Sequence, residues 1–241
     1  KDFERDTGIQ IRAVYDTEEA KSTGVMNRLL AEKSNPQADV YWANEPVRAD
    51  VLRQQGISVA FKPAAGQSIS TDFKDAEGYW TGFSARARVF VVHRSAKFKP
   101  KGIESYLDPM ARGRGVIANP LFGTTTAQMA ALFTTWGDEK GRQFLNSLKA
   151  NGVKLSTGNG ESADFVATGE FDFALVDSDD AVARIREKKP IEIVYPDQGA
   201  TDPGLLLIPN AVALIRGGPN AENGRRLIEY LLSKETEHKL A

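Results

Sequence analysis

The segment Gly115–Thr126 contains the clearest arrangement of groups that could bind an anion. Its apolar first part, Gly115–Asn119, is followed by a turn containing Pro and Gly and then by Thr124, Thr125 and Thr126. The first N–H groups of a helix lack intrahelical partners, and the helix dipole favours negative charge beside them. A helix beginning here would offer amide and hydroxyl donors to a phosphate, carbonate or carboxylate. Ordinary N-capping by threonine is the alternative interpretation.

A second group of candidate residues is a run of carboxylates after another largely apolar segment. Phe171–Val176 predicts a buried strand, and Asp177, Asp179 and Asp180 follow it. Carboxylates at this density could hold a hard cation or an ammonium group, since such ions prefer oxygen ligands. The competing interpretation is that Ser178 caps a helix while Asp179 and Asp180 complement its dipole.

Four more side chains could take part in binding. Asn159 lies in the loop Thr157–Gly160, where its amide could donate to an anion or simply form a turn. Arg86 and Arg88 alternate along a predicted strand, so both could grip an anion from one side or form surface ion pairs. Glu45 follows another predicted strand, where it could ligate a metal or interact with a helix dipole.

The composition excludes several classes of protein. The 241 residues include no Cys, which rules out disulfide scaffolds, thiol catalysis and Cys-based metal centres. Lys and Arg total 31 against 32 Asp and Glu, without the basic excess of a nucleic-acid binder. The two histidines, His93 and His238, lack metal-site spacing. Neither a phosphate-binding loop with Gly-Lys-Ser/Thr nor a Gly-x-Ser-x-Gly elbow occurs, so nucleotide hydrolysis and serine hydrolysis have little support.

Apolar periodicity predicts strands alternating with helices, the pattern of an α/β protein with a largely parallel sheet. The predicted strands are Ile9–Tyr15, Ala38–Trp42, Ala87–His93, Gly115–Asn119, Val153–Ser156, Phe171–Asp177, Ile191–Tyr195 and Leu205–Ile215. The predicted helices include Pro46–Gln55, Thr125–Trp136, Asp138–Ala150, Glu161–Thr168, Asp180–Lys188 and Asn220–Leu240. Because such sheets bind ligands beyond the carboxyl ends of their strands, the candidate residues above occupy suitable positions.

Several segments, taken in order, resemble the family 1 extracellular solute-binding proteins of ABC transporters, particularly their ferric-iron-binding branch. The segments are Phe3–Ile9, Pro36–Trp42, Ser84–Val89, Leu148–Gly152 and Thr201–Gly204. The resemblance spans most of the chain. It implies a two-lobed periplasmic-binding-protein-like α/β fold, with mixed, mostly parallel sheets, helices on both faces and crossover strands as a hinge.

The same resemblance implies an organisation and a site. Residues 1–93 with 210–241 would form one lobe and residues 94–209 the other, with the ligand in the cleft between them. The family's anion-binding turn would fall on Phe122, Gly123 and Thr124, its anion-contacting Asn on Asn159, and its Arg on Arg86 or Arg88. A periplasmic or membrane-tethered location, a membrane permease as partner and a monomeric state are expected.

Two departures from the family pattern bear on the ligand. Ferric binders of this type usually place adjacent tyrosines where this chain has Asp179 and Asp180, so phenolate ligation is not expected. Carboxylates, with Glu45 as a further candidate, could still hold Fe³⁺ together with carbonate or phosphate. Family members also usually begin with a strand before Phe3 and continue past the closing helix, so both ends are expected to be trimmed.

The leading functional hypothesis is therefore a non-enzymatic solute-binding component of an ABC importer, which captures a small anion or iron(III) with a synergistic anion. A second hypothesis is a binding protein for a phosphonate, a phosphorylated compound or another zwitterionic solute. A third, from another class, is an enzyme that uses the helix start Thr124–Thr126 as an oxyanion site with Asp177 as general base. Turnover would separate the third from the first two.

Overall fold

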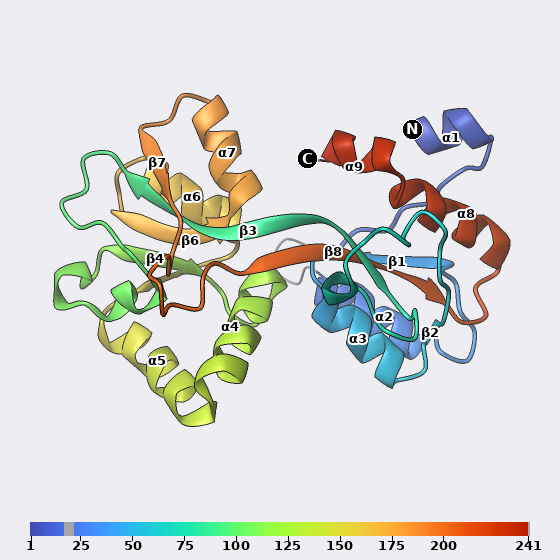
Figure 1. The fold of residues 1–241 in the computed structure, drawn as a ribbon, viewed down its shortest axis with the longest axis horizontal. Helices are drawn as coiled ribbons and strands as arrows, with labels where there is room; N and C mark the ends of the chain where they lie inside the picture. The colour runs from blue at the N-terminus through green and yellow to red at the C-terminus, as the bar shows by residue number, and fades with distance from the viewer. Residues whose placement is uncertain (17–21, 241) are drawn as a thin grey trace. The chain divides into compact units, whose positions relative to one another are not determined.

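The structure, a computed structural model, describes residues 1–16 and 22–240. The chain divides into two compact units: unit 1 comprises Lys1–Ala85 with Pro209–Ala241, and unit 2 comprises Arg86–Ile208. Both boundaries fall inside long strands, β3 (Thr81–His93) and β8 (Leu207–Ile215), so each of these strands belongs partly to both units (Figure 1).

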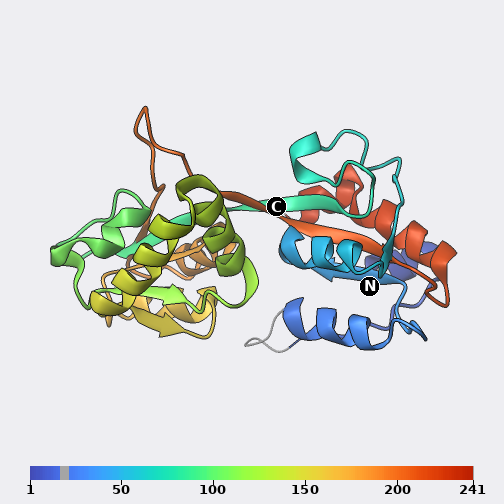
Figure 2. The ribbon, with the colours of Figure 1, turned by 90° about the horizontal axis from the view of Figure 1, so that it is seen from below.

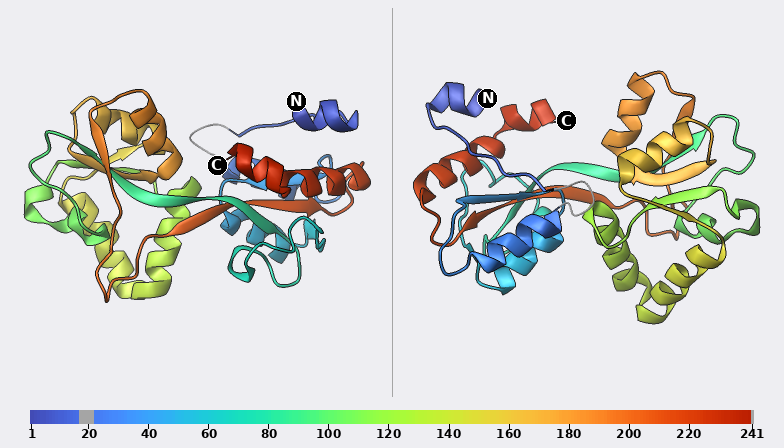
Figure 3. Two further views of the ribbon diagram at one scale, coloured as in Figure 1. Left: turned by 45° about the horizontal axis from the view of Figure 1, so that its top comes forward. Right: turned by 180° about the vertical axis from the view of Figure 1, so that it is seen from behind.

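Unit 1 is built around β8, which pairs antiparallel with β1 (Val40–Ala43) and β2 (Ser58–Val59). Successive β8 side chains enter different cores: Ala213 and Ile215 pack with α2 (Ser22–Ala31) and α3 (Pro46–Gln54), whereas Leu214 packs with α8 (Ala221–Leu231). This period of two is what a strand covered on both faces requires. Helices consequently lie on both faces of the sheet (Figure 3), and α2 lies beside α3 (Figure 2). The helices of unit 1 are α1 (Asp2–Thr7), α2 (Ser22–Ala31), α3 (Pro46–Gln54), α8 (Ala221–Leu231), α9 (Lys234–Leu240) and the short 3₁₀ helix η1 (Thr71–Phe73).

Two expectations for unit 1 were wrong in detail. Ile9–Tyr15 forms no strand. Alternating apolar residues determine which side chains share a face, but a strand also needs hydrogen bonds from a second segment. The predicted single helix Asn220–Leu240 is divided into α8 and α9. The Ser233 hydroxyl accepts a hydrogen bond from Thr236 N at 3.3 Å, which caps the start of α9 and favours a new helix over a continuous one.

Unit 2 contains a mixed sheet whose strands follow the order β3, β6 (Phe173–Asp177), β4 (Gly115–Ala118) and β5 (Lys154–Ser156), and β7 (Ile191–Val194) also pairs with β3. β4 runs parallel to β5 and β6, whereas β3 runs antiparallel to β6 and β7. Along β3, Phe90 and Val92 enter the core with α4 and α5, and Val89 and Val91 enter the core with α6 and α7. The remaining elements of unit 2 are η2 (Ile103–Leu107), η3 (Pro109–Ala111), β4 (Gly115–Ala118), α4 (Gly123–Trp136), α5 (Asp138–Ala150), β5 (Lys154–Ser156), α6 (Asn159–Ala167), β6 (Phe173–Asp177), α7 (Ser178–Arg186) and β7 (Ile191–Val194).

The predicted fold class is confirmed: the sheets are mixed and helices cover both faces. The order of elements also explains how unit 2 positions a site. Strand β4 leads into α4, β5 into α6 and β6 into α7, and these strands are mutually parallel. The N-termini of α4, α6 and α7 therefore lie at one edge of the sheet, beyond the carboxyl ends of its strands.

Candidate anion site

The N-termini of α4, α6 and α7 gather at one edge of the sheet, and their N-cap residues provide no capping side chain. The N-caps are Phe122, Gly158 and Asp177, and none of them accepts a side-chain cap hydrogen bond. The amides of each first turn lack intrahelical partners, so this edge of the sheet carries a concentration of positive helix ends. Such an arrangement favours a bound anion.

Glycine at the first position of α4 has a conformational reason. Gly123 has a φ of 59°, in the left-handed region that L side chains rarely adopt. The turn before it is tied by Asn119, whose carbonyl accepts from Phe122 N at 3.2 Å and whose side chain accepts from Leu121 N at 3.1 Å. The turn Asn119–Gly123 thus sets the direction in which α4 begins.

Behind these helix starts lies a buried network centred on Arg88 and Asp177. Arg88 Nη1 donates to Asp177 Oδ1 at 2.7 Å and to Asn159 Oδ1 at 3.0 Å. Thr124 Oγ1 donates to Asp177 Oδ2 at 2.8 Å, and Asn159 Nδ2 donates to the same oxygen at 3.1 Å. Asn159 Nδ2 also lies 2.9 Å from Thr124 Oγ1. The network joins β3, β6, α4 and α6.

Burial makes this network energetically important. Arg88 is 0% exposed and Asp177 5%, while Thr124 and Asn159 are equally buried. Removing one partner from a buried ion pair leaves an uncompensated charge and typically costs about 3–5 kcal/mol. Arg88 Nε is also buried and has no hydrogen-bond partner among the residues that the structure describes. One donor of Arg88 therefore remains unsatisfied within the buried network.

The remaining predicted residues of unit 2 lie around this network. Thr125 is buried and accepts from Arg88 Nη2 at 3.4 Å, whereas Phe122 and Thr126 are partly exposed. Arg86 is partly exposed, and its Nε lies 3.8 Å from Asp179 Oδ1. One carboxylate oxygen from each of Asp177, Asp179 and Asp180 lies within 4.8 Å of the other two. Unit 2 thus brings the predicted anion-binding and carboxylate residues to one region.

Glu45 is the exception, since it belongs to unit 1. It is the N-cap of α3, is fully buried, and accepts from Val47 N at 2.5 Å and from Arg48 Nη1 at 3.4 Å. Burial raises the pKa of its carboxyl group, although Arg48 and the backbone donors act in the opposite direction. Its contacts in unit 1 are those of a helix cap.

The sequence did not reveal that Arg88 and Asp177 neutralise each other. The two residues lie directly opposite in the antiparallel register of β3 and β6. A signal was present, since each lies on an apolar predicted strand where an unpaired charge would be costly. Without the register, however, several pairings of these strands were possible.

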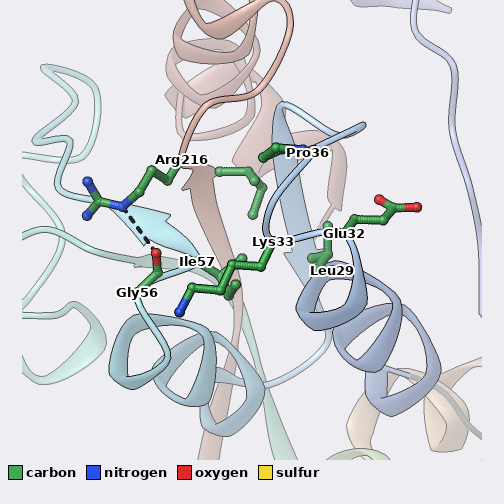
Figure 4. Close-up of a pocket in the computed structure, with 8 residues that line it drawn as sticks. Leu29, Glu32, Lys33, Pro36, Gly56, Ile57 and Arg216 are labelled. Carbon is green, nitrogen blue, oxygen red and sulfur yellow. Dashed lines mark hydrogen bonds between the residues drawn. The ribbon is translucent and has the colours of Figure 1, made fainter.

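A small hollow in unit 1 also contains charged side chains (Figure 4). Arg216 Nε donates to Gly56 O at 3.1 Å, and Lys33 Nζ donates to Gln55 O at 2.7 Å. Both side chains therefore donate to backbone carbonyls of the loop after α3. None of the predicted site residues lines this hollow.

An α/β fold of two compact units with helix N-termini gathered at a sheet edge is typical of proteins that bind small solutes. The bacterial extracellular solute-binding protein family matches residues 1–241, so the chain belongs to that family. Its members are transport binding proteins, and the predicted family and solute-binding role are confirmed at this level. Among residues 1–16 and 22–240, no helix has the length and apolar character needed to cross a membrane.

Individual relatives differ in the ligand that their names give. The chain is 27% identical over 242 residues to the putative 2-aminoethylphosphonate-binding periplasmic protein of Salmonella typhimurium, covering 99% of this chain and 69% of that protein. It is 26% identical over 262 residues to the major ferric iron-binding protein of Neisseria meningitidis, covering 99% and 72%. Iron-bound HitA from Pseudomonas aeruginosa has the same fold, with a TM-score of 0.89 at 24% identity over 99% of this chain and 77% of that one.

Proposed function

We propose that this protein is the solute-binding component of an ABC importer and captures a small anion at the helix N-termini of unit 2. The observation that carries the proposal is the convergence of three uncapped helix starts around a buried arginine with an unsatisfied Nε. The captured solute is passed to a membrane permease. The protein acts in the periplasm or tethered outside the cell membrane, as a monomer.

The proposed ligand donors are mainly backbone amides. The amides of Gly123, Thr124 and Thr125 lie in the first turn of α4. Amides at a helix start can hold an oxyanion without a formal positive charge. Arg86 is partly exposed on the same sheet edge and supplies a cation whose Nε lies 3.8 Å from Asp179 Oδ1. The side chains of Thr124 and Asn159 orient the helix starts through Asp177.

We favour an organic phosphonate or phosphate that also carries an ammonium group. Asp179 and Asp180 each place a carboxylate oxygen within 4.8 Å of one on Asp177, at the start of α7, although Asp180 also lies 3.9 Å from Arg184 Nη1. Carboxylates at this sheet edge suit a zwitterion with an acidic and a basic end. A relative named as an aminoethylphosphonate-binding protein supports the same ligand class.

Iron(III) with carbonate or phosphate is the second candidate. The cluster of carboxylate oxygens within 4.8 Å and the relatives named as iron binders favour it. Against it, Asp177 already accepts from Arg88, Thr124 and Asn159, so only Asp179 and Asp180 have oxygens outside that network. Hard trivalent cations prefer more oxygen ligands than two side chains supply.

Calorimetric titration and thermal-shift assays with inorganic phosphate, 2-aminoethylphosphonate, ferric citrate and carbonate would test the proposal. A ligand at 100 times its Kd stabilises the folded state by about 2.7 kcal/mol. We expect 2-aminoethylphosphonate to bind tightest, with no chemical turnover. Absence of binding by all four would contradict the proposal, and tightest binding of ferric citrate would support the iron candidate.

An enzymatic role for the same residues is less consistent with the contacts. A general base must reach the proton that it abstracts, whereas the oxygens of Asp177 are both occupied by donors of the buried network. Unchanged 2-aminoethylphosphonate recovered after incubation with the protein would support binding alone. Release of phosphate would establish catalysis instead.

A further inference from the structure

The buried pair of Arg88 and Asp177 places an internal carboxylate beside the proposed anion site. Asp177 accepts from an arginine, a threonine hydroxyl and an asparagine amide, which are the donor types that proteins use to bind external anions. Apart from the buried Arg88 Nε, these side-chain donors are therefore already occupied. A solute bound to the amides at the start of α4 would lie near the Asp177 carboxylate. Only the hydroxyl group of Thr124, which donates to Asp177, would lie between them.

We propose that Asp177 is a specificity-determining residue that sets the charge of the anion site without contacting the solute. This inference rests on the proposed anion-binding function. Asp177 neutralises Arg88, so the site attracts an anion through helix ends rather than through a full positive charge. A solute with a compensating ammonium group is favoured over a fully ionised inorganic anion.

The burial of the pair supports a charge-setting role over direct contact. Arg88 is fully buried and is held by Asn159, Thr124, Thr125 and the Leu175 carbonyl as well as by Asp177. Charges at such a position act on a neighbouring ligand through a medium of lower dielectric constant than water. The net charge of the pair should consequently affect affinity strongly.

This role predicts opposite effects for the two single substitutions. Asp177→Asn keeps a similar shape but leaves the positive charge of Arg88 uncompensated, so inorganic phosphate should bind about tenfold or more tightly. Arg88→Gln leaves the negative charge of Asp177, so phosphate should bind about tenfold or more weakly. The double variant R88Q/D177N restores neutrality and should fall between the two.

The experiment is calorimetric titration of the full chain and its variants with inorganic phosphate, after circular dichroism has verified folding. Asp172→Asn is the matched control, since it removes the same charge from an ion pair with Arg114 in unit 2 that lies outside the network. It should leave the affinity unchanged. If R88Q fails to fold, the comparison of wild type, D177N and the double variant still gives the sign of the effect.

The outcomes separate this inference from the proposed function. Tighter binding by D177N, reversed in the double variant, would support it. Weaker or unchanged binding by D177N, with wild type binding phosphate, would overturn the charge-setting role while leaving the proposed function intact. If neither wild type nor any variant binds an anion, the proposed function fails and this inference fails with it.

Discussion

At the scale of single residues, the contacts of Asn159 suggest a sharp test of the buried network. Its amide donates to Asp177 and its carbonyl accepts from Arg88, so both ends of the side chain are used. Asn159→Asp would place a second carboxylate beside Asp177 and remove a donor. We expect a loss of about 3–5 kcal/mol in the free energy of unfolding, measured by urea denaturation. Asn223→Asp, an exposed Asn-to-Asp change in the first turn of α8, should alter it by less than about 0.5 kcal/mol.

Glu45 gives a prediction about pH. Because its pKa is raised in the folded state, the native protein holds its proton to higher pH than the unfolded chain does. The contribution of Glu45 to stability should therefore fall as pH rises from about 4.5, the ordinary pKa of a glutamate side chain, through its raised pKa in the folded state. Unfolding free energies of wild type and Glu45→Gln at pH 4 to 7 would measure this. Wild type should lose stability relative to the variant; a constant difference would contradict the prediction.

At the scale of elements, the backbone conformation of Gly123 should affect both the stability of α4 and the affinity for phosphate. Gly123→Ala forces an L side chain into the left-handed region, which costs about 1–2 kcal/mol, and it should also weaken phosphate binding because the first-turn amides move. Gly137, at the other end of α4, has a φ of 81° and is a matched control. Gly137→Ala should be destabilising but leave phosphate affinity unchanged. If Gly123→Ala and Gly137→Ala both bind phosphate as tightly as wild type, the start of α4 does not bind the anion.

How much could be predicted also differs by element. The apolar strand, turn and threonine-rich start at Gly115–Thr126 were clear because local signals define them. The internal pairing of Arg88 with Asp177 was not, since it depends on the register between β3 and β6, which are far apart in sequence. Local alternation likewise predicted a strand at Ile9–Tyr15, but no described segment pairs with it.

At the scale of the whole molecule, the candidate anion residues are concentrated in one compact unit. Arg86, Arg88, Asn159 and the α4 start all belong to unit 2, so their arrangement is fixed by a single sheet and its helices. Glu45, the only predicted site residue in unit 1, is used there as a helix cap. Unit 2 alone should therefore supply the residues of the anion site. Membership of the solute-binding family indicates that the bound anion is a transported solute.

Amide NMR spectra of the full chain during titration with inorganic phosphate would show whether a small anion binds to the helix starts of unit 2. Saturable shifts should be largest for the amides of Gly123, Thr124 and Thr125, with smaller shifts for those of Asn159 and Gly160 at the start of α6. Titration with sodium chloride at matched ionic strength should not reproduce them. Shifts absent from these amides, or confined to unit 1, would contradict anion binding at the helix starts of unit 2.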